Sequence, residues 1–243
     1  DERVEVLDLE SDIVVYHPAD HRLLLCDSLQ KKDRFETFPA FSPDGRTLYF
    51  CSAEAKKIPE EYKEIRYNLC SIDFDPSAGT FGSRIDTLVN AEALGKSVSF
   101  PRPSYDGKYI MFTLSDYGNF SIWHKEANLW LLDLTSGDLR ELSEVNSDDT
   151  ESFHNWSSNS RWFVFSSRRG DGLYTHLYLA SMDENGKISK PFLLPQEDPE
   201  TYYDRSVYSY NVPDFVNAPI LLDTKVFEKR ITSKERIQVQ VGN

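Results

Sequence analysis

The stretch Phe-Pro-Ala-Phe-Ser-Pro-Asp-Gly-Arg-Thr-Leu-Tyr-Phe, residues 38–50, decides the fold. It has the pattern of one strand, a tight turn and a second strand. Proline presets φ at the first corner of the turn, aspartate hydrogen-bonds its own backbone, and glycine takes the left-handed conformation that lets the second strand leave. The stretch therefore predicts an antiparallel hairpin.

The same pattern recurs twice along the chain. Residues 100–108 read Phe-Pro-Arg-Pro-Ser-Tyr-Asp-Gly-Lys, and residues 153–161 read Phe-His-Asn-Trp-Ser-Ser-Asn-Ser-Arg. In each copy a serine opens the turn and a basic residue follows it. The third copy has Asn159-Ser160 where the others have Asp-Gly. Because serine is disfavoured in the left-handed conformation, we expect this hairpin to be the least regular of the three.

The segment after each turn is apolar almost without interruption (residues 47–52, 109–115 and 162–167), which predicts strands buried on both faces. A third strand and a more polar fourth strand follow in each copy. Four-stranded units of roughly 50–60 residues with doubly buried strands predict sheets stacked around an axis, a β-propeller. A single β-sandwich would instead show hydrophobic-in, polar-out alternation.

The sequence therefore predicts an all-β fold, a β-propeller of four-stranded antiparallel blades with three full repeats, which could be part of a six-bladed propeller. The chain starts without methionine, which we interpret as a processed or truncated product. The expected parts are the end of a preceding blade (1–37), three blades (38–98, 99–151 and 152–195) and a C-terminal tail (196–243). The tail segment 216–243 is expected to add two strands that close a blade with the N-terminal residues.

At this point the residues resemble a known family. The stretch 38–50 together with Asn-Leu-Cys-Ser-Ile-Asp-Phe (68–74) resembles the repeat of TolB-like β-propellers, a WD-like repeat class, and residues 128–142 resemble its third and fourth strands. Residues 151–199 with 209–215 resemble the last blade and tail of propeller proteins typical of Bacteroidetes. The resemblance implies a periplasmic or secreted protein of the bacterial envelope. It indicates the fold far more specifically than the function.

The amino-acid composition excludes some classes of binding partner. The net charge is −13, from 27 Lys and Arg against 40 Asp and Glu, so a phosphate backbone would be repelled and nucleic acid is not expected as a partner. No apolar run of 18 or more residues is present, so no membrane span is expected. The cysteines, Cys26, Cys51 and Cys70, match no metal-binding spacing and are expected to be small buried hydrophobes. A Cys51–Cys70 disulfide stays open for an oxidising compartment.

Binding residues are expected on the long loops. The loops between second and third strands, and those between blades, emerge at one end of a propeller, and loops on a rigid scaffold usually carry binding. Aromatic side chains there would stack on a peptide or a sugar, and arginines would hold a carboxylate. The alternatives are that Trp123 only pins its loop to the blade and that residues 166–172 are a solvated turn. The candidate contacts are Tyr117, Phe120, Trp123, His124, Arg168, Arg169, Asp171 and Tyr174.

Motifs of known catalytic sites do not appear in the sequence. We find no nucleophile elbow, no zinc-protease helix and no phosphate-binding glycine loop. Of the histidines, His154 is expected to be able to reach the central channel, and one histidine is too few for a metal site. We therefore expect a non-enzymatic module without cofactor or metal that binds a protein or peptide, with a glycan as a second ligand class. The alternatives are a propeller lyase or hydrolase, the gating propeller of a peptidase, and a structural spacer.

Overall fold

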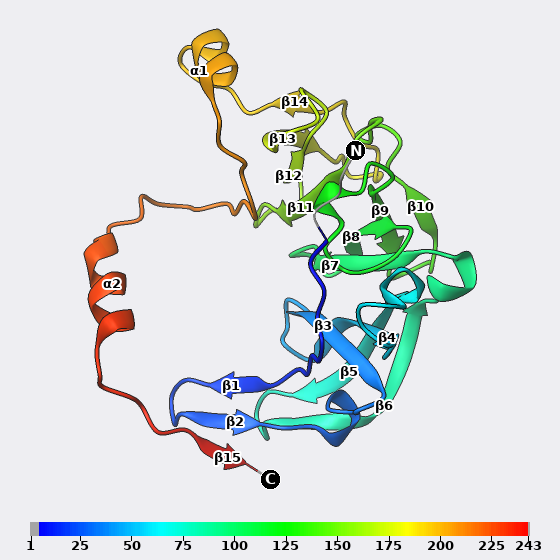
Figure 1. The fold of residues 1–243 in the computed structure, drawn as a ribbon, viewed down its shortest axis with the longest axis vertical. Helices are drawn as coiled ribbons and strands as arrows, with labels where there is room; N and C mark the ends of the chain where they lie inside the picture. Colours follow the sequence, from blue (N-terminus) through cyan, green and yellow to red (C-terminus); the bar gives the residue numbers. More distant parts are fainter. Residues whose placement is uncertain (1–4, 243) are drawn as a thin grey trace.

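The computed structural model describes residues 5–242, in which most strands form three four-stranded antiparallel sheets. In each sheet the spatial order of the strands follows the chain (Figure 1). The first sheet contains β3 (Arg34–Phe41), β4 (Thr47–Glu54), β5 (Asn68–Asp75) and β6 (Thr80–Val89). The second contains β7 (Ser97–Pro103), β8 (Tyr109–Ser115), β9 (Asn128–Asp133) and β10 (Leu139–Glu141). The third contains β11 (Glu151–Trp156), β12 (Trp162–Ser167), β13 (His176–Ser181) and β14 (Phe192–Leu193).

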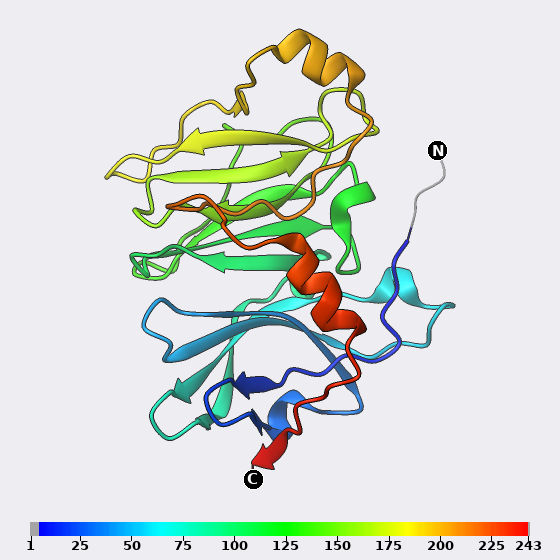
Figure 2. The same ribbon diagram turned by 90° about the vertical axis from the view of Figure 1, so that its left-hand side faces the viewer.

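The three sheets are the blades of a propeller. Figure 2 shows them stacked face against face, and Figure 1 shows them fanned along an arc. The first strands of successive blades, β3, β7 and β11, contact one another, so these strands lie innermost. The prediction of an all-β propeller with four-stranded antiparallel blades is confirmed. Short 3₁₀ helices lie at Asp27–Leu29, Tyr62–Glu64, Glu92–Leu94 and Ser121–Trp123.

The hydrophobic core lies in layers between blades, which explains the uninterrupted apolar strands. On β4, Tyr49 and Cys51 pack into the layer shared with the second blade, whereas Leu48 and Phe50 pack into the layer facing the N-terminal residues. Each fully buried phenylalanine or leucine stabilises the fold by about 1.5–3 kcal/mol. Cys70 belongs to the second of these layers, on the other face of the sheet from Cys51. The two thiols therefore do not form a disulfide, and all three cysteines are free.

The chain ends meet in a fourth sheet. The N-terminal residues form a hairpin of β1 (Val15–His17) and β2 (Arg22–Leu24), and β15 (Gln240–Gly242) pairs with β2 in parallel. The expectation of a second strand in segment 216–243 is wrong, because helix α2 (Thr224–Thr232) occupies that place. The carboxylate of Asp223 caps this helix by accepting the Lys225 N–H at 2.9 Å. A shorter helix, α1 (Pro199–Arg205), follows the third blade.

The three hairpin turns share one hydrogen-bond pattern. In the third turn, the Ser157 hydroxyl donates to Asn159 at 2.7 Å and accepts the Trp162 N–H at 3.0 Å, as its counterparts do in the other two turns. The expectation that this turn is the least regular is therefore wrong. Ser160 does have the strained positive φ of 56°, but its hydroxyl accepts the N–H of Asp106 from the second blade at 2.9 Å. This contact between blades offsets the strain.

Two further findings concern membrane spans and metal sites in the described residues. No helix in residues 5–242 combines the length and the apolar character needed to cross a membrane. Across the same residues, no group of three or more His, Cys, Asp or Glu side chains is placed to hold a metal ion.

Candidate functional site: an aromatic pocket at the propeller axis

Each inner strand carries a β-bulge at the first residue of the repeated motif. At this point two residues of the inner strand lie opposite one residue of the second strand, in all three blades. The first of the two is a phenylalanine with positive φ: 52° at Phe38, 54° at Phe100 and 48° at Phe153. Bulky residues rarely adopt this conformation, which costs about 1–3 kcal/mol at each position. Such strain persists where the surrounding structure enforces it, and it is enriched at functional sites.

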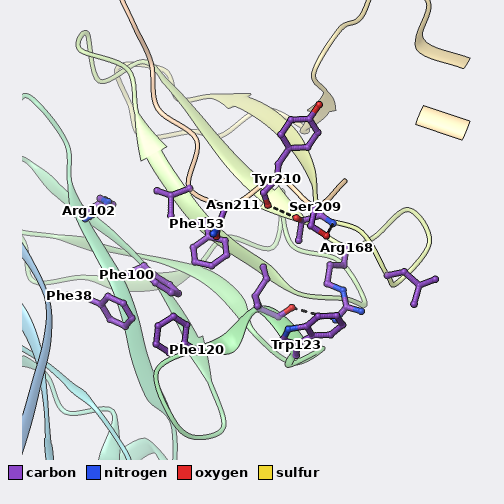
Figure 3. A pocket seen from close by; sticks show the side chains of 14 residues that line it. Phe38, Phe100, Arg102, Phe120, Trp123, Phe153, Arg168, Ser209, Tyr210 and Asn211 are labelled. Carbon is purple, nitrogen blue, oxygen red and sulfur yellow. Dashed lines mark hydrogen bonds between the residues drawn. The ribbon is translucent and has the colours of Figure 1, made fainter. Parts of the chain in front are cut away.

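The bulges bring the three phenylalanine rings together at the axis (Figure 3). The ring centroids of Phe38 and Phe100 lie 4.2 Å apart, and those of Phe100 and Phe153 lie 4.8 Å apart. Phe120 joins them from the loop after β8, with its centroid 5.9 Å from that of Phe38. The Phe100–Phe153 and Phe38–Phe120 pairs have the favoured edge-to-face arrangement, whereas Phe38 and Phe100 are tilted and in closer contact. Residues far apart in sequence thus build one aromatic cluster.

The cluster forms the floor of a pocket of about 520 Å³. This volume falls in the range of sites that bind small ligands or a few peptide residues. The loops after β8 and β12 form one side of the pocket. There the guanidinium of Arg168 lies over the indole ring of Trp123, 4.0 Å from its centroid. The remaining lining residues are Arg102, Ile122, Leu173, Thr175, Ser209, Tyr210, Asn211 and Val212.

The C-terminal tail supplies the last wall of the pocket, through residues 209–212. The Tyr210 N–H donates to the carbonyl of Thr175 at 3.0 Å, and the Thr175 hydroxyl donates back to the carbonyl of Tyr210. The Ser166 hydroxyl donates to the Asn211 carbonyl at 2.8 Å. These bonds attach the tail to the third blade, so the pocket is completed by a segment far from the repeats in sequence.

The structure distributes the residues proposed from the sequence over three places. Phe120, Trp123 and Arg168 line the axial pocket. Tyr117 and His124 lie on the neighbouring part of the same loop, beneath the N-terminal segment. Arg169, Asp171 and Tyr174 lie in the loop that precedes β13.

The N-terminal segment covers Tyr117 and His124. The Tyr117 hydroxyl donates to a carboxylate oxygen of Glu5 at 2.7 Å, and His124 Nε2 lies 3.4 Å from the other oxygen. The Asn119 amide donates to Asp8 at 2.6 Å. Tyr117 and His124 are buried. The acidic residues Glu5 and Asp8 thus pack against the loop after β8, and the side chains of Tyr117 and His124 are not accessible to a partner in this structure.

The loop before β13 is held by its own polar side chains. The Arg169 guanidinium pairs with the buried carboxylate of Glu151 at 2.8 Å and lies over the ring of Tyr178. The Asp171 carboxylate accepts the N–H groups of Leu173 and Tyr174 at 2.8 and 2.9 Å. These contacts fix the loop that carries Arg168 into the pocket.

The expectation that His154 reaches the channel is wrong. Its ring is buried, and Nε2 donates to the carbonyl of Met111 in the second blade at 2.9 Å. Burial lowers the pKa of His154 to about 3, so the ring is neutral at physiological pH. The histidine follows the bulged Phe153 and is directed away from the axis.

Sequence reasoning missed the three bulged phenylalanines as site residues, because they served there only as repeat markers. A signal was present. Pro39 and Pro101 follow two of them inside predicted strands, and proline, which cannot donate to a ladder, is confined within a sheet to edges and bulges. Arg102, two residues after Phe100, had no signal of its own, and the tail residues had none because their position depends on how the chain closes on itself.

Two buried glutamates occupy equivalent positions on inner strands, two residues before the bulge. Glu151 is well paired, with Arg169 and with the hydroxyls of Ser147 and Ser167 at 2.6 and 2.9 Å, although its burial still raises its pKa above the ordinary value. Glu36 is less well paired, because Arg34 Nε lies 3.9 Å away and one carboxylate oxygen has no hydrogen bond. Burial raises the pKa of Glu36 to about 7, and Arg34 offsets this only in part.

Comparisons with known proteins find partial likenesses among solved structures. No family model matches the sequence, and no curated protein matches it at a significant level. Among solved structures, TolB from Acinetobacter baumannii is 19% identical with a TM-score of 0.43, over 73% of this chain and 40% of that one. The propeller domain of the Trilobed protease from Pyrococcus furiosus is 16% identical with a TM-score of 0.39, over 68% of this chain and 44% of that one.

An oligogalacturonate lyase in complex with manganese is 12% identical with a TM-score of 0.48, over 69% of this chain and 44% of that one. The chain thus spans less than half the length of each of these proteins. They include TolB as well as a protease and a lyase, so the likeness does not choose between a binding protein and an enzyme. Because the superpositions are partial, the assignment of the fold rests on the sheet order and register described above.

Replacing Phe38 tests the energetic effect of its positive φ. Glycine is normally about 0.5–1 kcal/mol less stable than alanine in a strand, but at positive φ the order reverses. We expect Phe38→Gly to be more stable than Phe38→Ala by about 1 kcal/mol in urea unfolding. At Phe41 of the same strand, which has no positive φ, the alanine variant should be the more stable. The same order at both sites would contradict the bulge.

Glu36 predicts a stability that depends on pH. Its pKa in the folded state, about 7, lies above its ordinary value of 4.5. The folded protein therefore binds more protons, and the free energy of unfolding falls as pH rises between these values. We expect Glu36→Gln to match the wild type near pH 5 and to exceed it by about 1–2 kcal/mol at pH 8. The pKa of Glu151 is raised too, but its oxygens accept from Arg169 and from the Ser147 N–H. Glu151→Gln should therefore destabilise the protein at pH 8, by about 3 kcal/mol, because it leaves the Arg169 guanidinium without its carboxylate and places an amide NH2 among donors. A loss of stability in Glu36→Gln at pH 8 would refute this account.

Proposed function

We propose that the chain is a non-enzymatic interaction module that binds a protein or peptide partner at the loop end of its propeller, with the axial pocket as the main contact. The pocket itself carries this proposal. It is concave, its floor is aromatic, and its walls come from the long loops that a rigid β-scaffold positions. Such a site can accept apolar side chains of a partner without rearrangement of the blades.

The residue types in the pocket support a protein or peptide ligand. Tryptophan, tyrosine and arginine are the side chains that most often dominate the energy of protein interfaces. Here Trp123 and Arg168 hold each other in place, so little conformational entropy is lost when a partner binds. Aromatic faces also stack on sugar rings, which makes a glycan the second ligand class.

The lining of the pocket supports binding rather than catalysis. Activation of a hydroxyl or of a water for hydrolysis requires a base, and none of the described residues that line the pocket is a histidine, aspartate or glutamate. The Thr175 hydroxyl donates to the carbonyl of Tyr210, and the Ser209 hydroxyl accepts the Thr175 N–H at 3.4 Å. Both groups thus attach the tail to the blade. We further propose that the protein is periplasmic or secreted, in the bacterial envelope, and that it is of the propeller type found in Bacteroidetes.

A peptide selection tests the proposal. Random decapeptides displayed with free carboxyl ends are panned against the folded protein, and the affinities of enriched peptides are measured by calorimetry. We expect Phe120→Ala to weaken binding at least tenfold, or about 1.4 kcal/mol, because it removes part of the aromatic floor. Phe192→Ala, on the outer strand β14, is the matched control and should bind as the wild type does.

Two outcomes would contradict the proposed function. The first is that no peptide is enriched, or that Phe120→Ala binds the enriched peptides as well as the wild type does. The second is that mass spectrometry finds the bound peptides cleaved, which would favour the peptidase alternative.

A further inference from the structure

The charge of the pocket is opposite to that of the chain. Its lining contains two cationic side chains, Arg102 and Arg168, and no carboxylate, whereas the whole chain has a net charge of −13. Both arginines adjoin apolar surface, where a charge interacts more strongly than in water. In Figure 3 they lie on opposite sides of the labelled phenylalanine rings. A positive pocket in an acidic protein points to an anionic ligand group.

Arg168 is a fixed part of the wall. The residue is only 6% exposed, and its terminal nitrogens donate to the carbonyls of Gly172 and Ile122. Two of its donors are directed at backbone carbonyls and its plane lies against Trp123, although its buried Nε has no hydrogen-bond partner among the described residues. In this position Arg168 contributes positive potential, and its terminal nitrogens are not free to form a fork around a ligand.

Arg102 is the free cation of the pocket. It lies on β7, two residues after the bulged Phe100; the equivalent residues of the other blades are Ala40 and Asn155. Within the described residues its guanidinium makes no hydrogen bond or ion pair, although the charge of Asp214 acts on it from the tail. Burial lowers the pKa of Arg102, since the group has lost water without gaining a paired carboxylate. Its fork of donors suits a carboxylate.

We propose that the pocket binds the C-terminal residue of the partner chain, with the terminal carboxylate at Arg102 and an apolar side chain against the rings of Phe38, Phe100 and Phe153. This inference rests on the proposed function and specifies which part of the partner enters. A terminal residue is the one peptide unit that places a carboxylate directly beside its own side chain.

The lining favours a chain end over an internal acidic residue. A chain passing through the pocket would bury peptide groups on both sides of the acid. The polar side chains that could pair with them, Thr175, Ser209 and Asn211, lie on the tail side of the pocket. Unpaired peptide groups against the aromatic floor would each be unfavourable by about 1–3 kcal/mol. A chain end buries peptide groups on one side only.

A series of peptides tests this inference. Fluorescein-labelled octapeptides that differ only in the last residue are titrated against the protein by fluorescence anisotropy, each as the free acid and as the C-terminal amide. We expect the free acids ending in Phe, Tyr, Leu or Met to bind at least tenfold more tightly than their amides. Arg102→Met should reduce the affinity of the acid to that of the amide and leave the amide unaffected. It keeps the apolar stem of the side chain and removes a desolvated charge, so it should fold normally. Arg84→Met, on the exposed face of β6, is the matched control and should change neither.

Equal binding of acid and amide, or full binding by Arg102→Met, would overturn the inference. In that case, peptides that still depend on Phe120 would leave the proposed function standing. The display selection separates the two in the same way, because motifs at a constant distance from the carboxyl end support the inference and internal motifs contradict it. Failure of every peptide in both experiments would overturn both proposals.

Discussion

The strained bulge of each inner strand is the constraint on which the rest of the structure depends. Two residues of the inner strand lie opposite one residue of the second strand, and the first of them is a phenylalanine in the left-handed conformation, which is unfavourable for this residue. The second strand enforces this conformation, because it is buried between two core layers and cannot shift its register. What results is an aromatic ring directed at the axis from each of three blades. The scaffold and the pocket are therefore one construction: the packing that holds the blades also forces the rings together.

The N-terminal segment and the C-terminal tail complete the loop end of the propeller. The tail forms one wall of the pocket, and the acidic N-terminal segment lies over the neighbouring groove along Tyr117 and His124. The tail is attached by hydrogen bonds to the third blade, and the N-terminal segment is attached by the carboxylates of Glu5 and Asp8. Both segments come from outside the repeats, so the loop end of the propeller is shaped as much by the ends of the chain as by its blades.

The sequence was sufficient for the fold because turn chemistry and burial are local. Serine, aspartate and glycine at set positions specify the hairpins, and unbroken apolar segments imply two buried faces. The expectations that were wrong concern features that depend on contacts between residues far apart in sequence or on helix caps. Ser160 looked unfavourable until its contact with Asp106 of another blade was visible. Helix α2 lies where a strand was expected: Asp223 caps it, and Phe227 and Ile231 lie four residues apart, a helical spacing that the expectation of a strand overlooked. Phe120, Trp123 and Arg168 were identified from residue type, whereas Arg102 could be recognised only once the bulge at Phe100 placed it in the lining of the pocket.

The central claim is that Phe38, Phe100 and Phe153 meet at the axis, and nuclear Overhauser effects between their ring protons test it most directly. With phenylalanine as the one protonated aromatic residue in a deuterated sample, the centroid separations of 4.2 and 4.8 Å predict strong cross-peaks for Phe38–Phe100 and Phe100–Phe153. Assignment by single Phe→Leu variants should remove the matching peaks one at a time. If the folded protein shows no cross-peak between these rings, the bulges do not direct them to one point, and the pocket described here does not exist.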